Sequence, residues 1–425
     1  MTRGLRSIAE TSLEAQLISA LHSRDERSIR RRLPEPSTFS SSSGLIDFNS
    51  NDYLSLASSP TLRDRFLTKL RDAPDILGSG GSRLFFGSPA AILFNSGFDA
   101  NVGFFSCVPQ VGDVVVYDEY IHASVHDGVR ASRARGAHYP FEHNSMLAFR
   151  ALLTKLLDER PELKSGQSSL FVAVESLYSM DGTFAPLVDL VQVLDEFFPQ
   201  RNGYLVVDEA HSTGIYGPQG RGRVAQLGLE DKVLARLHTF GKALAATGGT
   251  HPSFYPSKLA NPPAAVILTS PLIRDYLLNY ARSLIYTTSL SFANIIAADC
   301  SFDMLMDGTA QKLSNKVLGL SRYFVEELRL RLRAVPIHLL SPARRSAVLI
   351  RSRFAHHPNH DNPPTTAVCP SLESRHERTP DYVADSAQGQ GPHRLIEGMM
   401  QWAEAEQIAE VHLAKDSTHA IQSKL

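Results

Sequence analysis

A lysine with small neighbours is the first residue of this chain whose type and position suggest covalent chemistry. Lys242 closes the segment Thr239–Lys242 and follows a predicted strand, Ala235–Phe240. Glycine precedes it, and alanines follow at positions 243, 245 and 246. On its own a lysine is more often a solvated surface charge. These surroundings, however, favour a desolvated amine with a lowered pKa, which a lysine that attacks a carbonyl group requires.

An acidic residue and an imidazole follow another apolar run, Leu205–Val207. Asp208 and His211 lie three positions apart in the segment Asp208-Glu209-Ala210-His211. Pyridoxal phosphate (PLP) needs an anionic partner for its pyridine nitrogen, because protonation there makes the ring an electron sink. Asp208 suits that role, and His211 could donate a hydrogen bond to the ring oxygen. A metal site would need more ligands than this spacing supplies, whereas a structural Asp–His pair remains an alternative.

A short turn supplies a candidate phosphate site. Asn95-Ser96-Gly97-Phe98 precedes a helical stretch, and backbone N–H groups at a helix start bind phosphate. Many loops carry Ser-Gly before a helix, so this signal is weak alone. Gly78–Ser82 is a second glycine-rich turn, but it matches neither the dinucleotide fingerprint nor the P-loop. NAD and ATP therefore lose support as cofactors.

Seven segments in a fixed order resemble the motifs of the α-oxoamine synthases, a family of PLP enzymes like the class II aminotransferases. They fall between about residues 30 and 290, and they are specific as a set although no single one is. The segments are Asn51–Leu54, Gly78–Ser82, Asn95–Val102, His122–Ser124, Glu175–Gly182, Asp208–Gly222 and Thr239–Lys242.

The resemblance implies a role for each matching residue. Lys242 would hold PLP covalently and take a proton from the amino acid, His122 would stack on the ring, and Asp208 and His211 would contact its nitrogen and oxygen. The remaining matches are Gly97, Phe98, Ser179 and Thr239 around the phosphate, Thr288 reaching the phosphate from a partner subunit, Glu175 near the ring, and Arg30 and Asn51 on the substrate side.

The resemblance also implies a reaction. Members of the family condense an acyl-CoA with an amino acid and release CoA and carbon dioxide. The expected substrates are pimeloyl-CoA and L-alanine, giving 8-amino-7-oxononanoate for biotin biosynthesis in a homodimer. A related synthase of secondary metabolism is one alternative, and a catalytically impaired scaffold subunit of the same fold is another.

Alternating elements must position these residues. Val114–Val116, Leu170–Val174, Leu205–Val207 and Val266–Leu268 predict buried parallel strands, and Leu187–Phe198 shows helical spacing. Ligands of open α/β sheets lie outside the carboxyl ends of the strands, where the polar residues fall. We expect an α/β protein of PLP-dependent transferase fold type I, with a mainly parallel sheet in a large domain and a smaller C-terminal α/β domain.

The expected boundaries are a helical arm at 1–50, a PLP-binding domain at 51–291, a small domain at 292–411 and a tail at 412–425. Three departures from the family stand out: an apparent deletion near 84–85, a proline-rich insertion at 249–264, and an atypical or disordered stretch at 344–392. The family places its carboxylate-binding arginine in that last stretch, and no motif assigns it here.

Composition narrows the class of protein. The chain has 43 basic and 44 acidic residues, so nucleic acid is not an expected partner. Three dispersed cysteines argue against a disulfide scaffold, and no apolar stretch predicts a membrane span. The amphipathic segment Leu13–Leu33 predicts a surface helix rather than a mitochondrial presequence. Ser423-Lys424-Leu425 matches the peroxisomal address, so we expect a peroxisomal import receptor as partner, with the cytoplasm as the alternative location.

Overall fold

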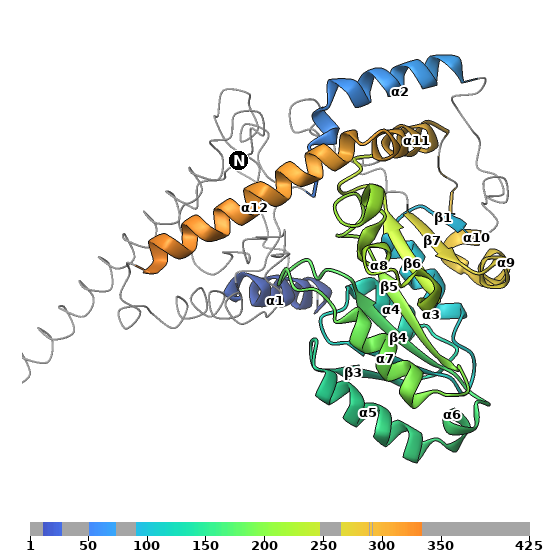
Figure 1. The fold of residues 1–425 in the computed structure, drawn as a ribbon. Helices are drawn as coiled ribbons and strands as arrows, with labels where there is room; N and C mark the ends of the chain where they lie inside the picture. Colours follow the sequence, from blue (N-terminus) through green and yellow to red (C-terminus); the bar gives the residue numbers. More distant parts are fainter. Residues whose placement is uncertain are drawn as a thin grey trace, which may run out of the picture.

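The core of the protein is a seven-stranded sheet with strand order β1-β7-β6-β5-β4-β2-β3 (Figure 1). The computed structural model describes residues 12–27, 51–73, 91–246, 265–288, 290 and 292–333. The strands are β1 (Ala91–Phe94), β2 (Val114–Asp118), β3 (His138–Phe141), β4 (Leu170–Glu175), β5 (Gly203–Asp208), β6 (Ala235–Thr239) and β7 (Ala265–Thr269).

Most neighbouring strands run parallel, as the sequence predicted, and β7 is the exception. Strands β3, β2, β4, β5 and β6 form a continuous parallel set. Strand β7 lies antiparallel to both β1 and β6. The interpretation of Val266–Leu268 as a parallel strand was therefore wrong. An apolar run reports that a strand is covered on both faces and says nothing of its direction.

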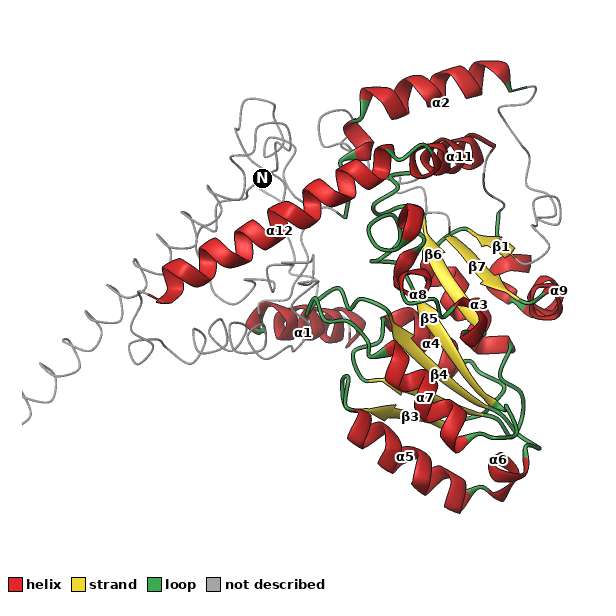
Figure 2. Cartoon of the chain, in the orientation of Figure 1, coloured by secondary structure: helices red, strands yellow, loops and turns green. Residues whose placement is uncertain are grey.

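Helices cover both faces of the sheet, so the molecule has three layers (Figure 2). One face packs against α5 (Met146–Glu159), α6 (Pro161–Ser165) and α7 (Leu187–Phe197). The other packs against α3 (Gly97–Cys107), α4 (Ala123–Arg130), α9 (Pro271–Tyr280) and α10 (Arg282–Ile285). This is a three-layer α/β architecture, as expected from the sequence, and α7 confirms the predicted helix at 187–198.

A third apolar cluster packs helices from both ends of the chain around the segment that follows Lys242. It joins Leu62 of α2 (Pro60–Asp72), Met304 of α11 (Phe292–Met306) and Ala310 of α12 (Thr309–Arg333) to Leu244. The Ser301 hydroxyl donates to the Leu244 carbonyl at 2.7 Å. Helices α2 and α11 lie side by side, and α12 extends away from the sheet (Figure 1). Helices α11 and α12 fill the first part of the predicted small domain, whereas the domain boundaries remain predictions.

The remaining elements are short or peripheral. Helix α1 (Ser12–Glu26) exposes Leu17, Ile18 and Leu21, in agreement with the predicted surface helix. The others are α8 (Gly222–Gln226) and the 3-10 helices η2 (Leu56–Ser58), η4 (Pro218–Gly220) and η5 (Glu230–Lys232).

Several features predicted from the sequence lie outside the described residues. These are Arg30, the glycine-rich turn 78–82, the junction at 84–85, the insertion 249–264, the stretch 344–392 and the C-terminal tail with Ser423–Leu425. Among the helices that the structure does describe, none is both long and apolar enough to cross a membrane. The described side chains also contain no group of three or more His, Cys, Asp or Glu that could hold a metal ion.

Candidate active site

The carboxyl ends of the central strands bring the predicted residues to one edge of the sheet. The pairing of β4 with β5 sets Glu175 beside Asp208. Thr239 ends β6, and Lys242 follows three residues later. His122 lies in the loop between β2 and α4. Parallel strands end at a common edge, so residues 120 positions apart in sequence meet at one site.

Lys242 lies at the centre of this group. Its amine lies 2.8 Å from Nε2 of His211. The Lys242 side chain is half-buried, and its amine is surrounded by protein atoms. Burial lowers the pKa of Lys242, and the nearby carboxylates of Asp208 and Glu175 oppose this change. A lowered pKa increases the fraction of unprotonated amine at neutral pH, which covalent chemistry with a carbonyl group requires.

A chain of hydrogen bonds continues from Lys242 toward the surface. His211 Nδ1 lies 2.7 Å from the Tyr53 hydroxyl, which donates to Asn51 Oδ1 at 3.0 Å. Since Tyr53 gives its single proton to Asn51, its oxygen accepts from His211 Nδ1–H, and Nε2 accepts from Lys242. Burial, reinforced by Lys242, lowers the pKa of His211 well below its ordinary value. His211 is therefore held neutral with its proton on Nδ1.

Asp208 is a buried carboxylate with both oxygens oriented by hydrogen bonds. Oδ2 accepts from Asn101 Nδ2 at 2.8 Å, and Oδ1 accepts from the Ala210 backbone N–H at 2.9 Å. An oriented carboxylate beside a lysine amine supplies the anionic partner that a pyridinium nitrogen needs.

Glu175 has a different environment, although it lies next to Asp208. Burial, and then the charge of Asp208, raise the pKa of Glu175 well above its ordinary value. Its carboxyl group accepts the backbone N–H of His122, which holds the loop before α4 against β4. Glu175 thus positions the residue predicted to stack on the cofactor ring.

His122 caps helix α4 with its own side chain. Nδ1 accepts the backbone N–H of Ser124 at 3.2 Å and lies 2.7 Å from the Ser124 hydroxyl. The Phe98 ring approaches it edge-on, with ring centroids 6.4 Å apart. Burial lowers the pKa of His122, so a neutral imidazole is favoured.

The candidate phosphate cradle consists of Gly97 and Thr239. Gly97 begins α3, and the hydroxyl of Ser96 accepts from the Asp99 backbone N–H at 3.0 Å, capping that helix. A Cβ at position 97 would lie 2.7 Å from Thr239 Cγ2, so the two residues are in direct contact. The Thr239 hydroxyl is buried and has no hydrogen-bond partner among the residues that the structure describes. A buried hydroxyl beside a helix N-terminus fits an anionic phosphate group.

Asn95 connects this cradle to the segment that contains Thr288. Its Nδ2 donates to the Thr287 hydroxyl at 2.9 Å and to the Thr288 carbonyl at 2.7 Å. The Thr288 backbone is thereby held at the end of β1 in its own chain. Ser179 is half-buried in the turn after β4. The contacts predicted for Thr288 and Ser179 with a phosphate remain predictions, as do the substrate contacts of Asn51 and Arg30.

Sequence reasoning gave no role to several polar residues of the site. Tyr53, Ser124 and Asn101 lie inside the recognised motifs. Each also contacts a residue of a different motif: Tyr53 contacts His211, and Asn101 contacts both Asp208 and Ser124. Glu209, next to Asp208, is buried and accepts the backbone N–H groups of Arg223 at 2.9 Å and Val224 at 2.7 Å. Its carboxylate thus anchors the glycine-rich turn at residues 214–222, which indicates a structural role.

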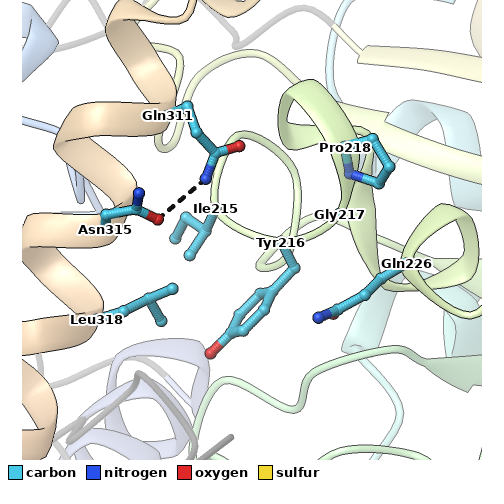
Figure 3. A pocket seen from close by; sticks show the side chains of 8 residues that line it. All are labelled: Ile215, Tyr216, Gly217, Pro218, Gln226, Gln311, Asn315 and Leu318. Carbon is cyan, nitrogen blue, oxygen red and sulfur yellow. Dashed lines mark hydrogen bonds between the residues drawn. The ribbon is translucent and has the colours of Figure 1, made fainter.

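A separate hollow lies between that turn and α12 (Figure 3). Its volume is about 370 Å³, and Gln311 Nε2 donates to Asn315 Oδ1 across one wall at 3.1 Å. The lining residues are Ile215, Tyr216, Gly217, Pro218, Gln226, Gln311, Asn315 and Leu318, and none of them was predicted for the site.

The fold and the site together define a PLP-dependent transferase of fold type I. Three features fit three groups of PLP. The buried Thr239 hydroxyl, without a partner among the described residues, fits the phosphate, and the lysine with a lowered pKa fits the aldehyde. The oriented Asp208 carboxylate fits the pyridine nitrogen. Comparison with known proteins narrows this class. The family of class I and II aminotransferases matches residues 44–338.

Curated relatives identify the branch of the family. An 8-amino-7-oxononanoate synthase from Emericella nidulans is 44% identical over 331 residues, which cover 73% of this chain and 75% of the relative. The aminoacyl transferase sphA of Aspergillus fumigatus is 39% identical over 301 residues, covering 67% of this chain and 60% of that protein. The chain therefore belongs to the class I and II aminotransferase family, and it is a PLP-dependent acyltransferase of the α-oxoamine synthase type.

Solved structures agree on the fold. A serine palmitoyltransferase from S. paucimobilis matches with a TM-score of 0.58 at 23% identity, covering 76% of this chain and 81% of that one. The 8-amino-7-oxononanoate synthase of Francisella tularensis matches with a TM-score of 0.50 at 26% identity, covering 67% of this chain and 76% of that one.

Proposed function

We propose that this enzyme condenses pimeloyl-CoA with L-alanine, releasing CoA and carbon dioxide, to form 8-amino-7-oxononanoate for biotin biosynthesis. The observation that carries the proposal is the 44% identity to the 8-amino-7-oxononanoate synthase of Emericella nidulans over three quarters of that protein. Lys242, His211, Asp208 and His122 all lie in the shared region and converge at one edge of the sheet.

Lys242 performs the proton transfer in this proposal. When bound, PLP supplies an electron sink for the negative charge that develops at the α-carbon of the amino acid. Because burial lowers the pKa of Lys242, a larger fraction of its amine is unprotonated and able to remove that proton. A base positioned in this way typically accelerates a reaction by about 10²–10⁴-fold. His211 accepts the Lys242 hydrogen bond at Nε2 and so orients the amine.

The other residues hold and orient the cofactor. Asp208 would maintain the positive charge on the pyridine nitrogen, Gly97 and Thr239 would bind the phosphate, and His122 would lie against the ring. Glu175 holds the His122 backbone through its N–H group. A chain that serves only as a scaffold would need none of these side chains in this arrangement.

A related synthase of secondary metabolism is the second candidate. The 39% identity to the aminoacyl transferase sphA supports it, since that protein aligns over 301 residues. In this proposal the two candidate functions differ in the acyl donor and the amino acid that the enzyme prefers. Rates measured with different substrate pairs therefore distinguish them.

The test is a substrate matrix with the purified full-length chain and PLP. CoA release is measured with pimeloyl-CoA and palmitoyl-CoA, each with alanine, serine or glycine, beside Lys242→Ala and the surface control Lys232→Ala. Lys232 pairs with Asp195 at 2.8 Å far from the site, so its loss should leave the rate unchanged. The highest kcat/KM with pimeloyl-CoA and alanine supports the proposal. A preference for a long acyl-CoA would refute it and favour the second candidate.

We further propose that the enzyme is a homodimer and is imported into peroxisomes. The resemblance of Thr288 to a residue that reaches a partner's phosphate supports the dimer, and Ser423-Lys424-Leu425 supports the location. Sedimentation of the PLP-loaded protein tests the first, with a monomer as the contrary result. A fluorescent fusion with and without the three terminal residues tests the second, and unchanged localisation would contradict it.

A further inference from the structure

We propose that Asn101 and Ser124 are positioning residues that bridge Asp208 to His122 and fix His122 as the neutral tautomer protonated at Nε2. Both are buried, and neither was given a role by the motifs. The inference depends on the PLP site and is independent of which acyl-CoA the enzyme uses.

The first step is the amide group of Asn101. Its Nδ2 lies 2.8 Å from Asp208 Oδ2 and 2.9 Å from Ser124 Oγ. A carboxylate oxygen can only accept, so the nitrogen of the amide must face Asp208. The two N–H groups of that nitrogen are then both committed, one to Asp208 and one to Ser124.

The second step is the direction of the bond from Ser124 to His122. The Ser124 oxygen accepts from Asn101, so its single proton is free to be donated to His122 Nδ1 at 2.7 Å. The Ser124 backbone N–H points at the same nitrogen from 3.2 Å. A ring nitrogen that accepts from two donors carries no proton, so the neutral imidazole is protonated at Nε2. The lowered pKa of His122, caused mainly by burial, agrees with a neutral ring.

The third step is the position of Asn101 on α3. Gly97 begins this helix, and Asn101 follows one turn later on the same face. A single helix thus carries a residue of the phosphate cradle and the residue that orients Asp208. Displacement of α3 would therefore disturb the phosphate cradle, Asp208 and His122 together.

The decisive variant is Asn101→Asp, which keeps the shape of the side chain and removes its N–H donors. Because the adjoining carboxyl groups at positions 101 and 208 would share one proton between them, position 101 has no donor left for Ser124. Ser124 then donates its proton to position 101, and its oxygen accepts from His122. Nitrogen-15 NMR of the cofactor-free, histidine-labelled full chain reads the tautomer directly, with His122→Gln to assign the signal. In the wild type, Nδ1 of His122 should show the resonance of an unprotonated nitrogen. In Asn101→Asp it should move to that of a protonated nitrogen.

Two further variants keep the test decisive. Ser124→Ala leaves only the longer backbone bond to Nδ1, so a population protonated at Nδ1 should appear even where Asn101→Asp does not fold. Asn279→Asp makes the same change on the exposed surface of α9 and should leave the His122 signals unchanged. Loss of a hydrogen bond to a charged group typically weakens binding about 10- to 100-fold, and Asn101→Asp should raise the dissociation constant of PLP by at least about tenfold. Wild-type nitrogen shifts for His122 in both Asn101→Asp and Ser124→Ala would overturn the proposal.

Discussion

Replacing Gly97 by alanine tests the phosphate cradle most directly. The added Cβ would lie 2.7 Å from Thr239 Cγ2, whereas its next neighbours, Leu237 Cδ2 at 3.7 Å and Thr239 Cβ at 4.0 Å, are at ordinary contact distances. Thr239 is buried at the end of β6 and cannot rotate freely, because its branched side chain is restricted. One methyl group therefore accounts for the whole clash.

The expected magnitude follows from two opposing effects. Overpacking of a buried contact costs about 1–3 kcal/mol. The change from glycine to alanine in a helix recovers up to about 1 kcal/mol, and less at the first helical position. We expect Gly97→Ala to lower the unfolding free energy of the cofactor-free protein by about 1–2 kcal/mol and to weaken PLP binding.

A double-mutant cycle assigns the loss to the predicted contact. Thr239→Ser deletes Cγ2 and keeps the hydroxyl, so Gly97→Ala should cost about 1–2 kcal/mol less in that background. Urea unfolding measures stability, and the visible absorption of bound PLP measures affinity. Gly319→Ala in α12 is the matched control, since a Cβ there meets nothing within 4 Å and should be neutral or stabilising. Equal losses from Gly97→Ala in both backgrounds would refute the reasoning.

Three further predictions address the lysine, the glycine-rich turn and the outer helices. Burial lowers the pKa of Lys242, so the unfolded chain binds more protons than the folded chain between that lowered pKa and the ordinary value of about 10.4, and this contribution to stability rises with pH. Lys242→Met should therefore stabilise the cofactor-free protein by about 0.5–2 kcal/mol at pH 7. Its advantage should shrink toward pH 10, and a constant or negative difference in urea unfolding would contradict the argument. Glu209→Gln places an amide N–H against the backbone donors of residues 223 and 224 and should cost about 3 kcal/mol or more, measured by thermal unfolding beside the exposed change Glu196→Gln. Lys69→Ala removes contacts of 2.5 Å to Asp299 and 2.6 Å to Asp303 on α11, and should cost no more than about 1 kcal/mol. That loss should largely vanish in 1 M salt, and a loss insensitive to salt would point to packing instead.

The sequence predicted the central strands better than the peripheral ones. Strands β2, β4, β5 and β7 were recognised because strands covered on both faces read as apolar runs. Strand β3 was missed, since it lies at the edge of the sheet, is only partly buried and contains Pro140, which an edge strand tolerates. Strand β1 was also missed, because it is only four residues long and alternates between half-buried and buried positions. The direction of β7 was misjudged because composition does not encode strand polarity.

The candidate site divides along a similar line. Asp208 ends a strand, Lys242 lies shortly after one, and Gly97 begins a helix, and the topology of an α/β sheet brings such positions together. Tyr53 meets His211 across 158 positions, and Asn101 meets Asp208 across 107. Such contacts depend on how α3 and the segment before α2 pack against the sheet. No local pattern in the sequence records that packing.

The place of β7 in the sheet has a consequence for the order in which the protein assembles during synthesis. Within the described part of the chain, β1 pairs only with β7, which is the last strand in sequence order there. Until residue 269 has been synthesised, β1 lacks this neighbouring strand, although α3 behind it can already pack against α4 and β6. Fragments that end before β7 should therefore leave the edge of β1 unpaired.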